Sequence, residues 1–149
     1  GAVYFQMSEE DVRRVLAFAP TMIGSDGLPH DIHPHPRLWG TFPRVLGRYA
    51  RDEGLFTLEQ AVHKMTGLSA RNFGLEGRGL VEPGAFADLT LFDPARVRDA
   101  ATFERPTTPA EGIELVMVNG RIAWRDGRPS EARAGRVLRR RTERRDRAS

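Results

Sequence analysis

The residues best suited to chemistry gather in one stretch, TMIGSDGLPHDIHPHPRLWG, between positions 21 and 40. Asp26 follows a short apolar run, and His30, His33 and His35 come soon after it. A carboxylate can move protons, and imidazole and carboxylate groups together bind divalent metals. Two interpretations of Asp26 stay open from spacing alone: a catalytic carboxylate, or a turn residue whose side chain bonds local backbone donors.

The histidines by themselves form a weak metal motif. His30, His33 and His35 lie close to Asp31, but prolines interrupt the loop and no second cluster of ligands follows in the chain. His63 falls on an expected helix, where a packed or solvent-facing side chain is more typical than a ligand. No nucleophile elbow, phosphate-binding loop or dinucleotide fingerprint occurs elsewhere.

Composition narrows the class of protein. The chain has 149 residues, of which 40% are hydrophobic and 29% charged, as expected for a single globular domain with a proper core. The absence of cysteine excludes disulfides and thiolate metal sites. No apolar run approaches the roughly 20 residues that cross a bilayer. We therefore expect a cytoplasmic protein without a membrane partner.

Charge is spread unevenly along the chain. The net charge is +3, yet residues 136–149 carry seven arginines against Glu143 and Asp146. We expect residues 141–149 to be a basic, disordered tail. Nucleic-acid binding is the less favoured alternative, because no aromatic residues for base stacking are interleaved with the arginines.

The first elements are expected to alternate helix and strand. Ser8 and Asp11 predict a capped helix start, and the helix should end at Pro20. Thr21–Gly24 reads as a short strand with Asp26 just beyond its carboxyl end. This order favours a parallel sheet, in which catalytic groups lie at the carboxyl ends of strands.

A loop and two helices are expected next. The stretch up to Gly40 is rich in proline and histidine and predicts a loop, with a helix from Phe42 onward. Thr57–Gln60 forms a capping box that opens another helix. Trp39, Phe42 and Trp124 are expected to be packing residues.

After residue 76 the pattern becomes β-rich. Asp88–Phe92 reads as a strand, Asn119-Gly120 is a strong hairpin signal, and Asp126-Gly127 predicts a second turn. The predicted parts are residues 1–75, of mixed helix and strand, residues 76–140, rich in strands, and the tail at 141–149.

Five segments together resemble the carboxy-terminal portion of the D-aminoacylases. They are IGSDG, HPHPRLWGTFPRVLGRY, LEQAVHKMTGLSARNFGL, GRGLVEPGAFADLTLFDP and VMVNGRIAWRDG. The D-aminoacylases are N-acyl-D-amino-acid deacylases of the amidohydrolase superfamily. The resemblance runs from about Val3 to Arg140, and HPHPRLWGTFPRVL is its most specific piece.

The resemblance implies both a fold and a reaction. The fold class is α/β, with the carboxy-terminal end of a metal-dependent (β/α)8 barrel in residues 1–75 and a β-sandwich portion in residues 76–140. The reaction is zinc-dependent hydrolysis of the amide bond of N-acyl-D-amino acids. Asp26 matches the aspartate that touches the metal centre and takes a proton from water, and Arg37 matches the arginine that holds the substrate carboxylate.

Large parts of the family pattern are absent from this sequence. The HxH segment, the bridging ligand and the histidines of the middle strands are missing, and a complete barrel needs about 250 residues. We therefore expect the isolated chain to be inactive, and to self-associate or to need the missing amino-terminal barrel. The alternative is a non-catalytic binding or assembly module that docks on a partner chain supplying the rest of the barrel.

Overall fold

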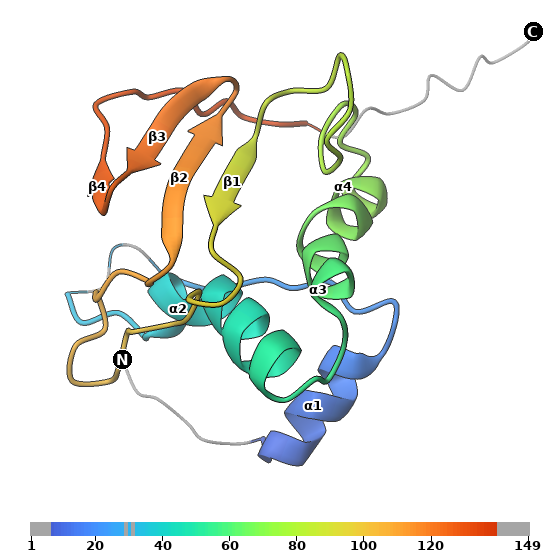
Figure 1. The fold of residues 1–149 in the computed structure, drawn as a ribbon, viewed down its shortest axis with the longest axis vertical. Helices are drawn as coiled ribbons and strands as arrows, with labels where there is room; N and C mark the ends of the chain where they lie inside the picture. Colours follow the sequence, from blue (N-terminus) through green and yellow to red (C-terminus); the bar gives the residue numbers. More distant parts are fainter. Residues whose placement is uncertain (1–6, 29, 31, 140–149) are drawn as a thin grey trace, which may run out of the picture.

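The computed structural model describes residues 7–28, 30 and 32–139, and places helices on one side and a sheet on the other (Figure 1). The helices come first and the strands second along the chain. In order, the elements are α1 (Glu9–Ala17), α2 (Arg37–Arg44), a π-helix (Val45–Asp52), α3 (Leu58–Met65), α4 (Gly67–Phe73), β1 (Leu89–Phe92), β2 (Ile113–Val118), β3 (Arg121–Arg125) and β4 (Arg128–Pro129). The predicted tail at 141–149 lies outside the described residues.

Two helix starts follow the predicted capping chemistry. The side chain of Ser8 accepts a hydrogen bond from the Asp11 amide at the start of α1. At α3, Thr57 and Gln60 bond each other's backbone amides in a full capping box. Both caps satisfy amide groups that the first helical turn leaves without partners. No helix in the described part of the chain is long and apolar enough to span a membrane.

The predicted loop ends earlier than Gly40: its described residues up to Pro36 lie in no helix or strand, but residues 37–40 are helical. Helix α2 begins at Arg37, directly after Pro36, and continues without a break into the π-helix. Proline is well tolerated at a helix start, because its fixed backbone angle suits the first turn. Pro43 also lies inside α2.

The predicted strand at Thr21–Gly24 does not form in this structure. These residues have no sheet partner, and every strand pair among the described residues is antiparallel. Ile23 donates its amide instead to the Lys64 carbonyl on α3, at 3.3 Å. A strand needs a neighbouring strand to satisfy its backbone, and the described chain offers none at this position.

The sheet is a simple antiparallel meander in the order β1-β2-β3-β4. Asn119 and Gly120 join β2 to β3 with φ angles of 48° and 77°, and Asp126 and Gly127 join β3 to β4 with 52° and 78°. Two successive residues with positive φ match the twist of the paired strands. Both turns predicted from the sequence are thereby confirmed.

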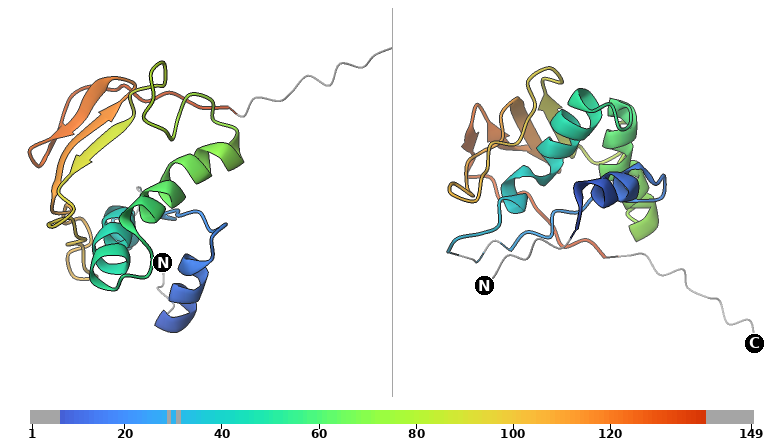
Figure 2. Two further views of the ribbon diagram at one scale, coloured as in Figure 1. Left: turned by 45° about the vertical axis from the view of Figure 1, so that its right-hand side comes forward. Right: turned by 90° about the horizontal axis from the view of Figure 1, so that it is seen from below.

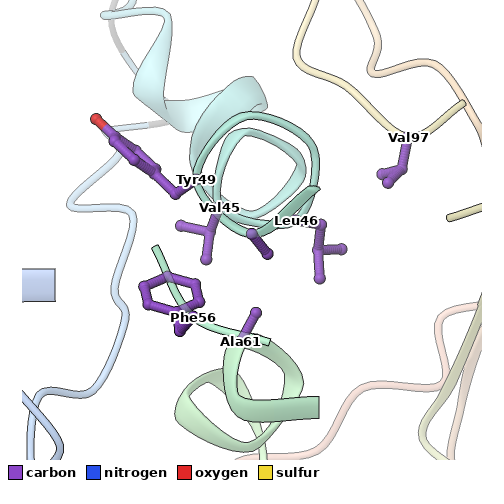
Figure 3. Close-up of a cluster of buried hydrophobic side chains, with 7 residues drawn as sticks. Val45, Leu46, Tyr49, Phe56, Ala61 and Val97 are labelled. Carbon is purple, nitrogen blue, oxygen red and sulfur yellow. The ribbon is translucent and has the colours of Figure 1, made fainter. Parts of the chain in front are cut away.

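The hydrophobic core lies among the helices (Figure 3). Buried side chains from the π-helix pack against α3 and the segment before it, and Val97 joins from beyond β1. By contrast, no residue of the four strands is buried. The members of the core are Val45, Leu46, Tyr49, Ala50, Phe56, Ala61 and Val97.

The chain between β1 and β2 runs beside the helices (Figure 2). Val97, in this connection, packs into the helical core. Arg51 of the π-helix donates a hydrogen bond to the Val97 carbonyl at 2.7 Å. Gly47 and Gly112 both face the backbone at this point, and a Cβ added to Gly112 would lie 2.6 Å from the Val97 nitrogen. The junction is therefore a close backbone-to-backbone contact.

Candidate functional site

Asp26 and Arg37 meet in the structure. An Arg37 guanidinium nitrogen lies 2.9 Å from Asp26 Oδ2. Both side chains reach solvent, with 82% of the Asp26 side chain and 43% of the Arg37 side chain exposed. The two residues singled out by the sequence thus form one exposed ion pair.

Local geometry explains why residues eleven positions apart come together. Asp26 has a φ of 50°, a left-handed conformation that aspartate tolerates better than most residues. Gly27 then lies against the first turn of α2, where a Cβ would stand 2.8 Å from Leu38 Cα. The close approach of the Gly27 backbone to Leu38 brings Asp26 beside Arg37.

Lys64 of α3 anchors the segment that leads to Asp26. Its side chain is buried, with 5% exposure. The Nζ atom donates to the carbonyls of Phe18 at 2.6 Å and of Ala19 and Thr21 at 3.3 Å each. Burial lowers the pKa of Lys64. The lysine was not predicted from the sequence, although its place three residues after buried Ala61 puts it on the apolar face of the helix.

His35 lies at the start of α2, beside the ion pair. Its Nδ1 atom accepts a hydrogen bond from the Arg37 backbone amide at 3.0 Å. Burial lowers the pKa of His35, the charge of Arg37 lowers it further, and the charge of Asp26 opposes this shift. The ring also stands edge-on to Phe103, with centroids 5.2 Å apart and planes at 76°.

His33 makes a separate contact to the same residue. Its Nε2 atom lies 2.8 Å from the Phe103 carbonyl, so the protonated nitrogen donates to that oxygen. His30 and His63 are exposed. Phe103 was missed by the sequence analysis, and nothing in its surroundings in the sequence would have signalled it.

The described residues do not make a metal centre by themselves. No group of three histidine, aspartate or glutamate side chains in this part of the chain is arranged to hold a metal ion. Asp26 offers carboxylate oxygens, but its nearest partner is a cation, and His33 and His35 bond to other protein groups. A zinc ion would need further ligands from elsewhere.

The site can nevertheless do two things chemically. An exposed ion pair contributes little to stability, about 0 to 1 kcal/mol, so both partners can exchange it for other groups. A guanidinium freed from Asp26 can hold a carboxylate through two parallel hydrogen bonds. A carboxylate freed from Arg37 can accept and return a proton.

A second surface feature is apolar and lies between α2 and the sheet. Trp39 and Pro43 of α2 face Trp124 of β3 and Val116 of β2 across an open groove. Trp39 and Phe42 keep 39% and 43% of their surface exposed. The predicted packing role of Trp39 is therefore only partly fulfilled within the described residues.

Curated relatives match almost the whole chain. A D-aminoacylase of Alcaligenes xylosoxydans xylosoxydans is 66% identical over 93% of this chain. An N-acyl-D-glutamate deacylase of the same organism is 55% identical over 94%. The chain spans only 28% of the length of each. The resemblance inferred from the sequence motifs is confirmed.

Solved structures agree in fold. A crystal structure of D-aminoacylase, described as defining a novel subset of amidohydrolases, superposes with a TM-score of 0.90 and 66% identity over 92% of this chain and 29% of that one. An N-acyl-D-glutamate deacylase of Bordetella bronchiseptica, complexed with zinc and a phosphonate mimic of the tetrahedral intermediate, superposes with a TM-score of 0.84 and 52% identity, covering 89% of this chain and 28% of that one. The profile of the Amidohydrolase family matches residues 17–124. The chain therefore belongs to the amidohydrolase family.

Proposed function

We propose that this chain is the carboxy-terminal part of a zinc-dependent N-acyl-D-amino-acid deacylase. The observation that carries the proposal is the meeting of Asp26 and Arg37 at 2.9 Å on one exposed surface. One residue suits proton transfer, and the other suits recognition of a carboxylate. Similarity to three D-amino-acid deacylases over 93% or 94% of the chain favours this function over a non-catalytic assembly module.

In this proposal Arg37 binds the carboxylate of the N-acyl-D-amino acid and leaves its pair with Asp26. Asp26 accepts a proton from the water molecule whose oxygen bonds to the acyl carbon. When the amide C–N bond breaks, that proton passes to the leaving nitrogen, and the products are a carboxylic acid and a free D-amino acid. The described residues supply one carboxylate toward a metal, so the remaining zinc ligands belong to the missing part of the protein.

The same proposal gives the two halves of the chain their places. Residues 1–75 would be the last strand and helix units of the barrel, with Thr21–Gly24 paired to a strand that this chain lacks. Residues 76–140 would be a share of a β-sandwich. The absence of a partner strand for Thr21–Gly24 among the described residues is consistent with this placement.

The test uses the intact protein that carries this chain, with N-acetyl-D-amino acids and their neutral carboxamides as matched substrates. Arg37→Ala should lower kcat/KM for the acids, at a cost of about 2 to 4 kcal/mol in transition-state stabilisation, because a charged hydrogen bond to substrate is lost. The carboxamides should be almost unaffected. Asp26→Asn should damage both substrate classes alike, since it removes the group that moves the proton.

Arg37→Lys is the control, because it keeps the charge but not the planar pair of donors. It should lie between wild type and Arg37→Ala on the acids. Equal losses on acids and carboxamides for Arg37→Ala would show that Arg37 only holds the loop together. Absence of any deacylase activity in the intact wild-type protein would refute the proposed function.

A further inference from the structure

We propose that His35 and Phe103 are positioning residues for Arg37, and that this pair sets recognition of the substrate carboxylate. The inference rests on the proposed function and deepens it. Arg37 would contact the substrate. His35 would hold the Arg37 backbone, and Phe103 would hold the His35 ring. The β-rich part of the chain would thereby control a site that lies on the helical part.

The first link is the hydrogen bond from the Arg37 amide to His35 Nδ1, at 3.0 Å. Arg37 is the first residue of α2, and its amide is one of those that the helix leaves without a partner. The preceding Pro36 makes no side-chain cap. The His35 side chain therefore caps the start of α2. The direction in which the Arg37 side chain leaves the backbone depends on this cap.

The hydrogen bond also fixes the tautomer of His35. The Arg37 amide can only donate, so Nδ1 must be the unprotonated nitrogen and the ring proton lies on Nε2. A side chain that lacks an acceptor at this position leaves the amide without its partner. The role therefore requires an acceptor and not merely a ring.

The second link is Phe103, in the connection between β1 and β2. Figure 1 shows this connection, in gold, beside the start of α2. The Phe103 ring meets His35 edge-on at 5.2 Å, and its carbonyl accepts from His33 at 2.8 Å. Phe103 thus contacts both His33 and His35, the two histidines just before α2.

The third link anchors that connection to the helices. Arg44, at the end of α2, pairs with Asp99 at 2.8 Å, and the backbone around Val97 packs on the π-helix. Both of these anchors precede Phe103; after it, Glu111 forms a backbone bridge and an ion pair with Arg98, so the connection is held on both sides of Phe103. Phe103 can act as a fixed wall for the His35 ring.

Two variants of His35 separate the hydrogen bond from the ring contact in the intact protein. His35→Asn keeps an acceptor that can bond the amide two residues ahead, but loses the ring. His35→Phe keeps a ring against Phe103 but has no acceptor. His35→Phe should raise KM for N-acetyl-D-amino acids about tenfold, the cost of one lost hydrogen bond, with kcat changed less than about twofold.

The controls make the positioning role distinguishable from a structural one. His35→Asn should restore most of the affinity for acids, and the KM for neutral carboxamides should be unchanged in every variant. Phe103→Leu should give a smaller rise of KM on acids alone. His63→Phe, at an exposed histidine of α3, is the matched control and should behave as wild type.

Equal KM values for His35→Phe and wild type on acids, or equal rises on acids and carboxamides, would overturn the proposal. Amide hydrogen exchange at Arg37 supplies a readout without activity. Exchange should be faster in His35→Phe than in wild type and protected in His35→Asn. An inactive wild type with this exchange pattern would sink the proposed function but keep the positioning of Arg37; unchanged exchange in His35→Phe would sink the positioning itself.

Discussion

Lys64 places a charge in the interior next to the segment that carries Asp26. An ammonium group loses hydration when it is buried, and only hydrogen bonds to the protein can offset that cost. Three carbonyls do so here, those of Phe18, Ala19 and Thr21. Two of them lie just past the end of α1, where the helix dipole is negative. The Lys64 ammonium group therefore links α3 to the end of α1 and to the segment that leads to Asp26.

Replacing Lys64 with methionine should destabilise the protein by about 2 to 4 kcal/mol, because three carbonyls lose a shared donor while the volume stays similar. Thermal unfolding of the intact protein measures the loss. Arg71→Met, at an exposed cation on α4, is the control and should change stability little. A Lys64→Met protein as stable as wild type would show that the carbonyls find water instead.

Asp26 was a candidate from its residue type and position, and Arg37 was expected only through the resemblance to the D-aminoacylases. No spacing rule predicts that the backbone of Gly27 approaches Leu38 and so brings the two residues together. Phe103 could not be found from the sequence, because its contact with His35 depends on how a long connection folds back. Tertiary contacts of this kind carry no local pattern.

A network of charges links α1 to the π-helix and the residue after it. Glu53 accepts from Arg13 at 2.8 Å and from Arg48 at 2.7 Å. Glu9 of α1 pairs with Arg48 at 3.1 Å and accepts from the Tyr49 hydroxyl at 2.8 Å. These bonds hold α1, the helix before the segment that carries Asp26, against the π-helix.

The hydrogen bonds from Arg13 and Arg48 lower the pKa of Glu53 from 4.5 to about 2. Because the folded pKa lies below the unfolded one, the unfolded chain binds the proton more readily. The stabilising contribution is therefore fully present above about pH 4.5 and is lost as the pH falls toward 2. Glu53→Gln should flatten the fall of the melting temperature across this window. An unchanged slope in the variant would assign the acid sensitivity to other carboxylates.

Elements with local signals were predicted well. The caps at Ser8 and Thr57 and both hairpin turns depend on a few neighbouring residues, and the structure has them. The π-helix at Val45–Asp52 could not be foreseen, since its residues carry the same apolar pattern as an α-helix. The strand expected at Thr21–Gly24 has no partner strand among the described residues.

None of the four strands has a buried residue, so the sheet adds no buried core to the molecule. Its apolar side chains are left partly open, with Leu89 exposed by 36% and Leu91 by 55%. The outer edges of β1 and β4 pair with no other strand of the described sheet. Open sheet edges and apolar faces of this kind favour association with another polypeptide segment.

The isolated chain of 149 residues should therefore self-associate, and should bind less than one zinc per chain because its described residues form no group of three metal ligands. Sedimentation and elemental analysis measure the two properties. Adding the amino-terminal barrel of the proposed deacylase should suppress association and raise zinc binding together. A monodisperse monomer with one tightly held zinc would contradict the expectation and would point back to the histidines near Asp31.

The junction around Val97 has a consequence for how the sequence can change over time. Gly47 and Gly112 both approach the main chain at Val97, and the closest atoms to an added methyl group are backbone atoms. Trimming the Val97 side chain would leave those atoms where they are. A smaller side chain at position 97 therefore cannot relieve a substitution at either glycine, so these two positions should tolerate fewer substitutions than their neighbours.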